Sequence, residues 1–222
     1  MLGLSELYSR LRENFGFLNW WPGETKEEIV VGAVLTQNTA WKNVEKAIKN
    51  LKEKNVVSID RLAGIDLSEL ESLIRPAGFY RQKAKRLKGL ALYIKESGGL
   101  EKFFQKDEEE LRKELLSLNG IGKETADSII LYAAEKPTFV VDAYTRRIMH
   151  RIYGIDEEIE YNDLKKYFEK RLEKDLELYK DFHAQFVELG KRFCRKVPRC
   201  KECPLRDYCQ YASKKIKSIQ SK

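Results

Sequence analysis

The chain has 222 residues, 42% of them hydrophobic and 35% charged, a composition that excludes an intrinsically disordered polymer and allows one large or two small domains with apolar cores. A formal net charge of +7 favours an anionic partner, either nucleic acid or an acidic membrane surface, although a highly charged solvated surface gives the same balance. The longest apolar run, Ile29–Leu35, is seven residues long and too short to span a bilayer. The N-terminus has neither the basic start nor the apolar stretch of a signal peptide, so we expect a cytoplasmic protein.

Amphipathic helices are predicted through the first part of the chain. Thr25 and Glu28 have the spacing of a capping box, and they open a helix whose unbroken apolar run implies deep burial. Two helices follow, and the second of them is closed by Pro76 and Gly78. The apolar faces of these two helices consist of Trp41, Val44, Ile48 and Leu51 in the first, and Leu70, Leu73 and Ile74 in the second.

A longer helix is predicted from Tyr80, with one apolar and one basic face. The apolar stripe consists of Ala84, Leu87, Leu90, Ala91 and Ile94. The basic face consists of Arg81, Lys83, Lys85, Arg86 and Lys88. Such a face is typical of a solvated helix surface, and in a DNA-binding protein it would also serve as a flank that faces phosphates.

Two further helices, Glu108–Leu118 and Glu124–Ala134, are separated by only five residues. Gly120 and Gly122 let the backbone turn sharply and approach another molecule closely, and Ile121 between them is expected to anchor the turn in the protein's own core. The second helix points its first backbone N–H groups and its positive dipole end outward, which suits a DNA phosphate and reads no base. Alternatively, the segment is an ordinary connection between helices whose glycines serve the turn alone.

The remaining helices are predicted at Asp142–Tyr153, Leu164–Leu172 and Tyr179–Phe193. Thr138–Val141 is a short β-branched run, too isolated to form a sheet, so the chain is predicted to be all-α. Asp142 stands at the start of one of these helices, where a carboxylate commonly serves as the N-cap.

All four cysteines lie close together, with the spacing Cys194-x5-Cys200-x2-Cys203-x5-Cys209. In a chain without a secretory signal, such a cluster indicates a metal site before it indicates disulfides. Four thiolates within sixteen residues can enclose a zinc ion or a [4Fe–4S] cluster, and the single Cys-x2-Cys pair favours the cluster. Arginines and lysines between the cysteines are expected to meet phosphates, so the predicted role of the loop is structural and electrostatic.

The hairpin pattern Leu118-x-Gly120-x-Gly122, the Val141-Asp142 pair about twenty residues later and the cysteine loop together resemble the helix-hairpin-helix DNA glycosylase superfamily, in particular its endonuclease III group. The resemblance covers nearly the whole chain. It implies two helical domains: a six-helix domain at residues 22–135 that ends in the hairpin, and a second domain from residues 1–21 and 136–222 that carries the cysteine loop at 194–209. A monomer would bind double-stranded DNA containing a damaged base in the cleft that these domains flank.

The resemblance also assigns roles to individual residues. Asp142 occupies the position of the family's essential carboxylate, which stabilises the positive charge that develops on the deoxyribose and orients the attacking water. Gln37 and Asn38 lie in the loop that fills the gap left by the flipped base. The residues expected at the DNA backbone are Gly120, Ile121, Gly122, Lys123 and Thr125. Cys194, Cys200, Cys203 and Cys209 would hold a [4Fe–4S] cluster, although the first gap is five residues here against the usual six, which leaves a different metal open.

Fewer residues indicate the type of reaction and the base that is excised. Endonuclease III has a lysine nucleophile at the position of Glu124, and a glutamate cannot form the Schiff base needed to cleave the strand, so the resemblance implies a monofunctional glycosylase. The segments Asn19–Gly23, Leu35–Trp41 and Gly122–Asp127 look like 3-methyladenine DNA glycosylase III, which stacks an alkylated purine on aromatic side chains. The residues expected at this pocket are Trp20, Trp21, Trp41, Glu124 and Lys191, the last of which is equally readable as a phosphate contact.

Three functions remain open on the sequence alone. The first is an alkylpurine glycosylase without lyase activity, favoured by the tryptophans. The second is an endonuclease III-like enzyme for oxidised pyrimidines, with or without lyase activity; Glu124 counts against a lyase. The third is a non-catalytic DNA-binding protein, against which the position of Asp142 counts. His150 and His183 are the two histidines and are too isolated in the sequence to suggest a ligand set.

Overall fold

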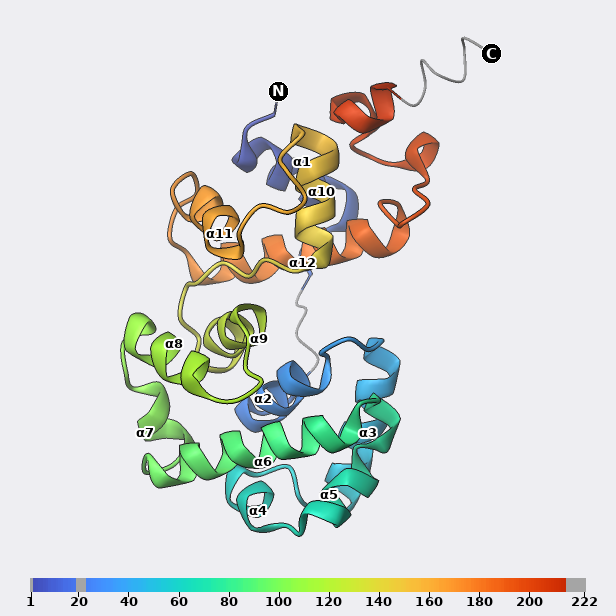
Figure 1. Cartoon of the computed structure of the whole chain (residues 1–222). Coiled ribbons are helices and arrows are strands. Elements are labelled where there is room, and N and C mark those ends of the chain that lie inside the picture. Colours follow the sequence, from blue (N-terminus) through green and yellow to red (C-terminus); the bar gives the residue numbers. More distant parts are fainter. Residues whose placement is uncertain (1, 19–22, 215–222) are drawn as a thin grey trace. The chain divides into compact units, whose positions relative to one another are not determined.

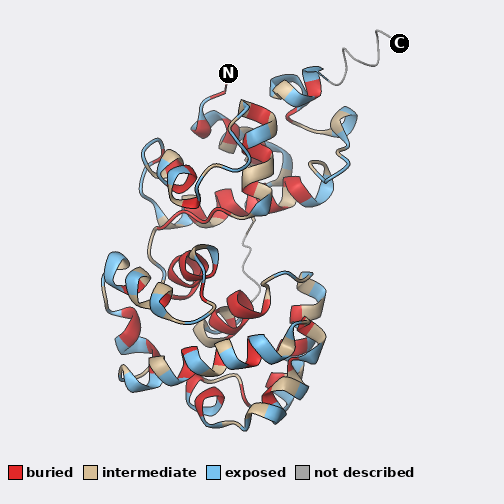
Figure 2. Ribbon diagram, in the orientation of Figure 1, coloured by how far each residue is buried: buried red, intermediate tan, exposed pale blue. Residues whose placement is uncertain are grey.

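The computed structural model describes residues 2–18 and 23–214. The chain divides into two compact units, Met1–Trp20 with Pro137–Lys222, and Trp21–Lys136 (Figure 1). Every regular element in the described ranges is a helix, so the predicted all-α class is confirmed, and Thr138–Val141 is irregular chain rather than a strand. None of the helices in these ranges is both long and apolar enough to cross a membrane. In both units the buried residues line the inner faces of the helices (Figure 2).

The unit that contains both termini is built on α12 (Leu176–Arg192), most of which is buried. Phe182 and Phe186 on this helix stack at a centroid distance of 4.7 Å, and Phe168 packs edge-on against both. The other elements of this unit are α1 (Leu4–Phe15), α10 (Ala143–Tyr153), α11 (Tyr161–Glu169), η3 (Cys200–Glu202) and η4 (Arg206–Tyr208).

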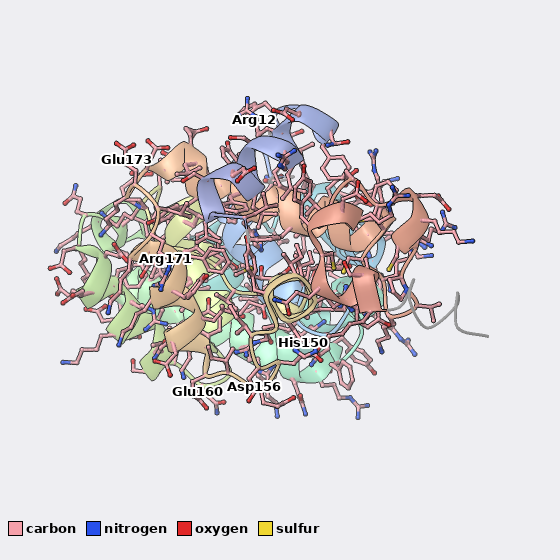
Figure 3. All side chains as sticks on the ribbon, turned by 90° about the horizontal axis from the view of Figure 1, so that it is seen from above. Arg12, His150, Asp156, Glu160, Arg171 and Glu173 are labelled. Carbon is pink, nitrogen blue, oxygen red and sulfur yellow. The ribbon has the colours of Figure 1, made fainter. Side chains whose placement is uncertain are left out.

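A buried carboxylate joins α1 to α12. Asp181 is fully buried and accepts hydrogen bonds from the Tyr8 hydroxyl and the Leu18 backbone N–H, both at 2.8 Å. Arg12, labelled on α1 in Figure 3, brings its Nη1 to 3.5 Å from the same carboxylate. Because a buried charge is tolerated only when it is paired and hydrogen-bonded, these contacts fix the N-terminal helix on α12.

The second unit is built around α2 (Lys26–Leu35), which packs against α3, α6, α9 and η2. The predicted capping box forms in part: Thr25 Oγ1 accepts from Glu28 N at 3.2 Å, whereas the Glu28 carboxylate accepts from Glu24 N, one residue before the cap, at 3.1 Å. The other elements are α3 (Trp41–Glu53), α4 (Ile59–Gly64), α5 (Leu67–Leu73), η1 (Arg75–Ala77), α6 (Tyr80–Glu96), α7 (Leu100–Phe104), α8 (Glu108–Ser117), α9 (Lys123–Ser128) and η2 (Ile129–Ala133).

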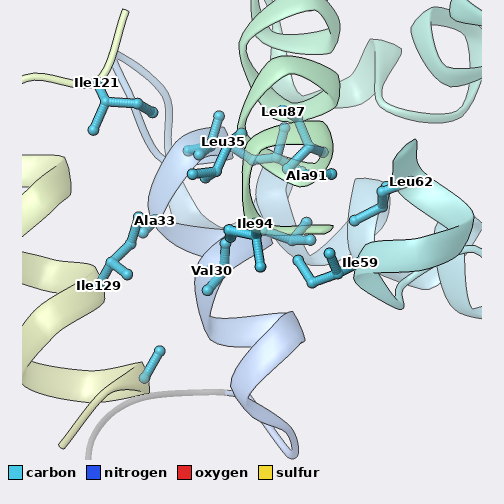
Figure 4. Close-up of a cluster of buried hydrophobic side chains, with 14 of the residues drawn as sticks. Val30, Ala33, Leu35, Ile59, Leu62, Leu87, Ala91, Ile94, Ile121 and Ile129 are labelled. Carbon is cyan, nitrogen blue, oxygen red and sulfur yellow. The ribbon is translucent and has the colours of Figure 1, made fainter. Parts of the chain in front are cut away.

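The core of this unit joins segments that are far apart in the sequence (Figure 4). Val30 and Leu35 of α2 lie in the same cluster as Leu87 of α6 and Ile129 of η2. Ile121, between the two hairpin glycines, is 5% exposed and belongs to this cluster, so its side chain anchors the turn from within.

The helix predicted at Glu124–Ala134 changes form partway along. α9 ends at Ser128, and η2 continues as a wider π-helical turn in which Ala134 N donates to Ile129 O, five residues earlier, at 3.0 Å. Ser128 Oγ donates to Glu124 O at 2.7 Å, a side-chain contact with the preceding turn that is known to distort helices locally.

The solvated interpretation of the basic face of α6 is wrong for Lys83. This lysine is 1% exposed, and its Nζ donates to the backbone oxygens of Leu35 and Ala77 at 2.9 and 2.8 Å. It thereby satisfies carbonyls at the ends of α2 and η1 that have no helical partner. Lys88 acts in the same way, since its Nζ donates to the oxygens of Ala63 and Ile65 beside the end of α4.

We predict that Lys83→Met lowers the free energy of unfolding by about 2 kcal/mol at neutral pH, because two buried carbonyls lose their donor. Burial, with a smaller contribution from Arg86, lowers the pKa of Lys83 from 10.5 to about 8. The unfolded chain therefore binds the extra proton between these values, and the stability of the wild type rises relative to the variant as pH increases from about 8 to 10.5. Chemical denaturation across this pH interval measures the difference.

Lys85→Met is the matched control, because Lys85 is an exposed lysine on the same helix. Its stability should follow that of the wild type at every pH. A constant gap between wild type and Lys83→Met over the interval would contradict the prediction.

Candidate active site

The carboxylate of Asp142 is the N-cap of α10. Its backbone is extended, and Oδ1 accepts hydrogen bonds from the Thr145 backbone N–H at 2.7 Å and from Thr145 Oγ1 at 2.8 Å. The helix start thus fixes the position of the side chain through one oxygen. Both of these hydrogen bonds are accepted by Oδ1, so the helix cap does not use the second oxygen, Oδ2.

His183, from the middle of α12, faces that second oxygen. Its Nε2 lies 3.7 Å from Asp142 Oδ2, and the ring is 4% exposed. This neighbour could not be predicted from the sequence, because the two positions lie 41 apart along the chain. The available signal was weak: a histidine within the buried middle of a helix.

Asp142 is held in its charged form. Burial is the largest influence on its pKa and raises it, but the nearby ring of His183, together with the two hydrogen bonds from Thr145, lowers the pKa below the usual value of 3.8. A carboxylate in this condition is an anion at neutral pH, and it can stabilise a nearby cation or accept a proton from water.

The predicted hairpin connects α8 to α9 through Gly120 and Gly122. A bidentate ion pair braces the two helices: Arg112 Nε donates to Oδ1 of fully buried Asp127 at 2.7 Å, and Nη2 donates to Oδ2 at 3.1 Å. Gly120 has a φ of +79°, and a Cβ there would lie 2.1 Å from Arg86 Nε. Both the backbone conformation and the space therefore require glycine at this position.

The Gln37 side chain is bound to this hairpin. Its Nε2 donates to Gly120 O and to Thr125 Oγ1, each at 3.0 Å, and its Oε1 accepts from Arg86 Nη1 at 2.6 Å. Asn38 follows in an exposed turn with a φ of +52°, a conformation that asparagine tolerates. The structure therefore joins two segments that the sequence linked to DNA, and it adds Arg86, which the sequence placed only on a basic face.

The residues expected at the base pocket are spread over several elements. The Trp41 ring is partly exposed and packs over Gly32 of α2, where a Cβ would come within 3.3 Å of the indole. Trp20 and Trp21 lie outside the described residues. The other two residues are exposed: Glu124 in the first turn of α9 and Lys191 in the last turn of α12.

The four cysteines line one small pocket, together with Arg151 of α10, Phe193 and neighbouring residues of the C-terminal segment. None of the cysteines forms a disulfide. Arg151 Nη1 lies 3.3 Å from Cys194 Sγ, and Arg147 Nε donates to Cys194 O at 2.8 Å, so α10 supports the start of the loop. Burial, the largest influence, raises the pKa of the Cys203 thiol to about 11.

The donor chemistry of this pocket fits iron or zinc, because both metals bind several thiolates that approach from different parts of one loop. Among the residues that the structure describes, no group of three or more His, Cys, Asp or Glu side chains is already arranged for direct metal binding. The fit therefore rests on the shared pocket and the donor type.

Comparison with known proteins places this geometry in a family. The family model described as "HhH-GPD superfamily base excision DNA repair protein" matches residues 31–174. The chain is 51% identical over 207 residues to the "Putative DNA repair glycosylase MJ1434" of Methanocaldococcus jannaschii, covering 92% of this chain and 94% of that protein.

Two solved structures are similar to this one. The 3-methyladenine DNA glycosylase of H. pylori, bound to 1,N6-ethenoadenine, has a TM-score of 0.76 and 33% identity, covering 86% of this chain and 98% of that one. A non-covalent endonuclease III–DNA complex has a TM-score of 0.83 at 24% identity, covering 98% and 100% of the two chains, and shows the same fold. The family model spans well over half of the chain, and the chain therefore belongs to the HhH-GPD superfamily of base excision DNA repair proteins.

Proposed function

We propose that this chain, a DNA N-glycosylase of the HhH-GPD superfamily, hydrolyses the N-glycosidic bond of an alkylated purine such as 3-methyladenine and does not cleave the DNA strand. The observation that carries the proposal is the Asp142 carboxylate, which is ionised and fixed through Oδ1 while Oδ2 is not used by the helix cap. A fixed anion is what a developing sugar cation requires.

The reaction begins when the damaged nucleotide leaves the base stack, at a cost of roughly a few kcal/mol. As the bond between C1′ and the base nitrogen lengthens, its electron pair leaves with the base and positive charge develops on the deoxyribose. Asp142 Oδ2 stabilises that charge, orients the water that attacks C1′ and accepts its proton. Because Thr145 already holds Oδ1, the carboxylate needs little rearrangement during this step.

An alkylated purine suits this site because it is cationic or electron-poor and is already a good leaving group. The 33% identity to a 3-methyladenine glycosylase supports this substrate class. We propose that Trp20, Trp21 and Trp41 stack on the flipped base, a contact that contributes roughly 1–3 kcal/mol per base. Lys191 is proposed to lie near the same pocket or on a phosphate.

Glu124 supports hydrolysis without strand cleavage. Its carboxylate cannot attack C1′ to form the Schiff base from which a lyase proceeds. An endonuclease III-like enzyme acting on oxidised pyrimidines is the second candidate, since the fold is shared with an endonuclease III–DNA complex.

We propose that the hairpin residues Gly120 to Thr125 contact the DNA backbone and that Gln37 and Asn38 fill the gap left by the flipped base. The net charge of +7 supports a phosphate-binding surface, and binding of duplex DNA by a monomer should weaken as salt increases.

We propose that Cys194, Cys200, Cys203 and Cys209 hold a [4Fe–4S] cluster. When bound, the cluster supplies cross-linking of the loop rather than bond-breaking chemistry. Arg147 and Arg151 hold the loop from α10, and the basic residues between the cysteines are then presented to phosphates.

Duplexes with one methylated adenine, one thymine glycol, one uracil or one abasic site test the substrate and the chemistry together. We predict release of the methylated adenine, with strand breaks only after treatment with alkali, because water rather than a lysine attacks C1′. Chromatography of the free base and gel analysis with and without alkali measure the two products.

Two results would contradict the proposal in different ways. Release of thymine glycol without methylated adenine would favour the endonuclease III-like candidate. Strand breaks without alkali at the abasic site would show that the enzyme is a lyase.

Metal analysis of protein purified without oxygen tests the cluster. We predict about four iron atoms and about four acid-labile sulfides per chain, with loss of both in Cys203→Ser, since each thiolate binds one corner of the cube. About one zinc per chain without sulfide would contradict the assignment.

A further inference from the structure

We infer that His183 is a positioning residue for this reaction: it faces the Oδ2 atom of Asp142 and keeps that oxygen oriented and ionised, so that it can stabilise the positive charge on the deoxyribose. The inference rests on the role proposed for Asp142. It assigns to α12 a part in the chemistry, whereas Asp142 itself belongs to the start of α10.

The packing of α10 on α12 brings the two side chains together. Tyr144, two residues after Asp142, lies against Gly190, and a Cβ on Gly190 would come within 2.1 Å of the Tyr144 ring. Gly190 is seven residues after His183, which is two helical turns and therefore nearly the same face of α12. A larger residue at 190 would separate the helices, so this close approach helps to fix the distance between Nε2 and Oδ2.

The far end of α10 is fixed to the segment that follows α12. Arg147 Nε donates to Cys194 O at 2.8 Å, and Arg151 Nη1 donates to Arg195 O at 2.6 Å. The crossing of the two helices is thus held at more than one point. His183 consequently meets a carboxylate whose own orientation Thr145 has already set.

Charged and titratable groups from α10, α1 and α11 lie on the elements packed around this pair. On α10, the Asp142 carboxylate faces His183 at 3.7 Å. From α1, Tyr8 and Arg12 approach α12 but are engaged with Asp181. From α11, the Tyr161 hydroxyl accepts from Val141 N at 3.3 Å, on the main chain just before Asp142.

The pKa of Asp142 makes the effect of His183 measurable. Burial raises this pKa, and His183 is the largest of the influences that lower it. Without His183, this lowering influence is lost and the pKa of the Asp142 carboxyl rises. Base release then falls as the solution becomes more acidic, because the charged form is the one that stabilises the sugar cation.

Single-turnover rates of base release from a duplex with one methylated adenine, measured from about pH 5 to about pH 8, test the inference. Spontaneous loss of the methylated base is subtracted with an enzyme-free sample. His183→Phe removes the polar ring but keeps a planar buried group, and we expect a loss of rate that is largest at the acidic end and shrinks toward pH 8, because a neutral carboxyl cannot stabilise the sugar cation. DNA affinity should stay unchanged.

His183→Gln is the conservative variant, because its amide nitrogen can occupy the position of Nε2 and donate to Oδ2. We expect it to recover most of the lost rate. His150→Gln is the matched control, since His150, labelled in Figure 3, is the other histidine and is exposed on α10. This control should keep the rate and the pH profile of the wild type.

Equal losses in the Phe and Gln variants at every pH would overturn the inference and show that His183 only supports packing. A wild-type rate and pH profile in both variants would overturn it as well. If His183→Phe has a lowered thermal midpoint, the profile of the Gln variant decides between these results. Asp142→Asn, assayed in parallel, keeps the two proposals distinct: base release by that variant contradicts the proposed function, whereas an inactive Asp142→Asn with an unaffected His183→Phe contradicts only the inference.

Discussion

The site depends on how one carboxylate is held. Asp142 begins α10, and its Oδ1 satisfies the Thr145 N–H group at the start of that helix. The requirement that a helix start be capped therefore places a charged group at a defined point and in a defined orientation. α12 then brings His183 to the other oxygen, and the close contact of Tyr144 with Gly190 sets the approach of the two helices. The same interaction that stabilises the helix prepares the anion for chemistry.

Buried polar contacts also hold the segments proposed to meet DNA. Arg112 and Asp127 brace the hairpin helices, and Arg86 and Gln37 bind the neighbouring loop to the Gly120 turn. Several cations therefore serve the protein's own architecture. The net charge of +7 counts these side chains together with those that face solvent, so it overstates the charge offered to phosphates.

The sequence predicted the helical class, most helix positions and the hairpin, because periodicity, caps and paired glycines are local signals. It could not predict that Lys83 is buried, since a lysine on the polar side of a helix looks the same whether it meets water or the carbonyls at another helix end. It also could not connect His183 with Asp142, because their contact depends on how α12 crosses α10. The link between Gln37, Gly120 and Arg86 was hidden for the same reason: its members come from three separate segments.

The N-cap and catalytic roles of Asp142 can be separated by one substitution. Asparagine caps helices about as well as aspartate, so Asp142→Asn should keep α10 and the stability of the protein while removing the charge. The direct measurement is the affinity of this variant for a duplex with a methylated adenine, together with the base that it releases in a single turnover. Our account predicts affinity within a factor of about three of the wild type and a loss of release of at least about a hundredfold, the usual scale for removing a catalytic acid or base. Release at the wild-type rate by a folded, DNA-bound Asp142→Asn would contradict it.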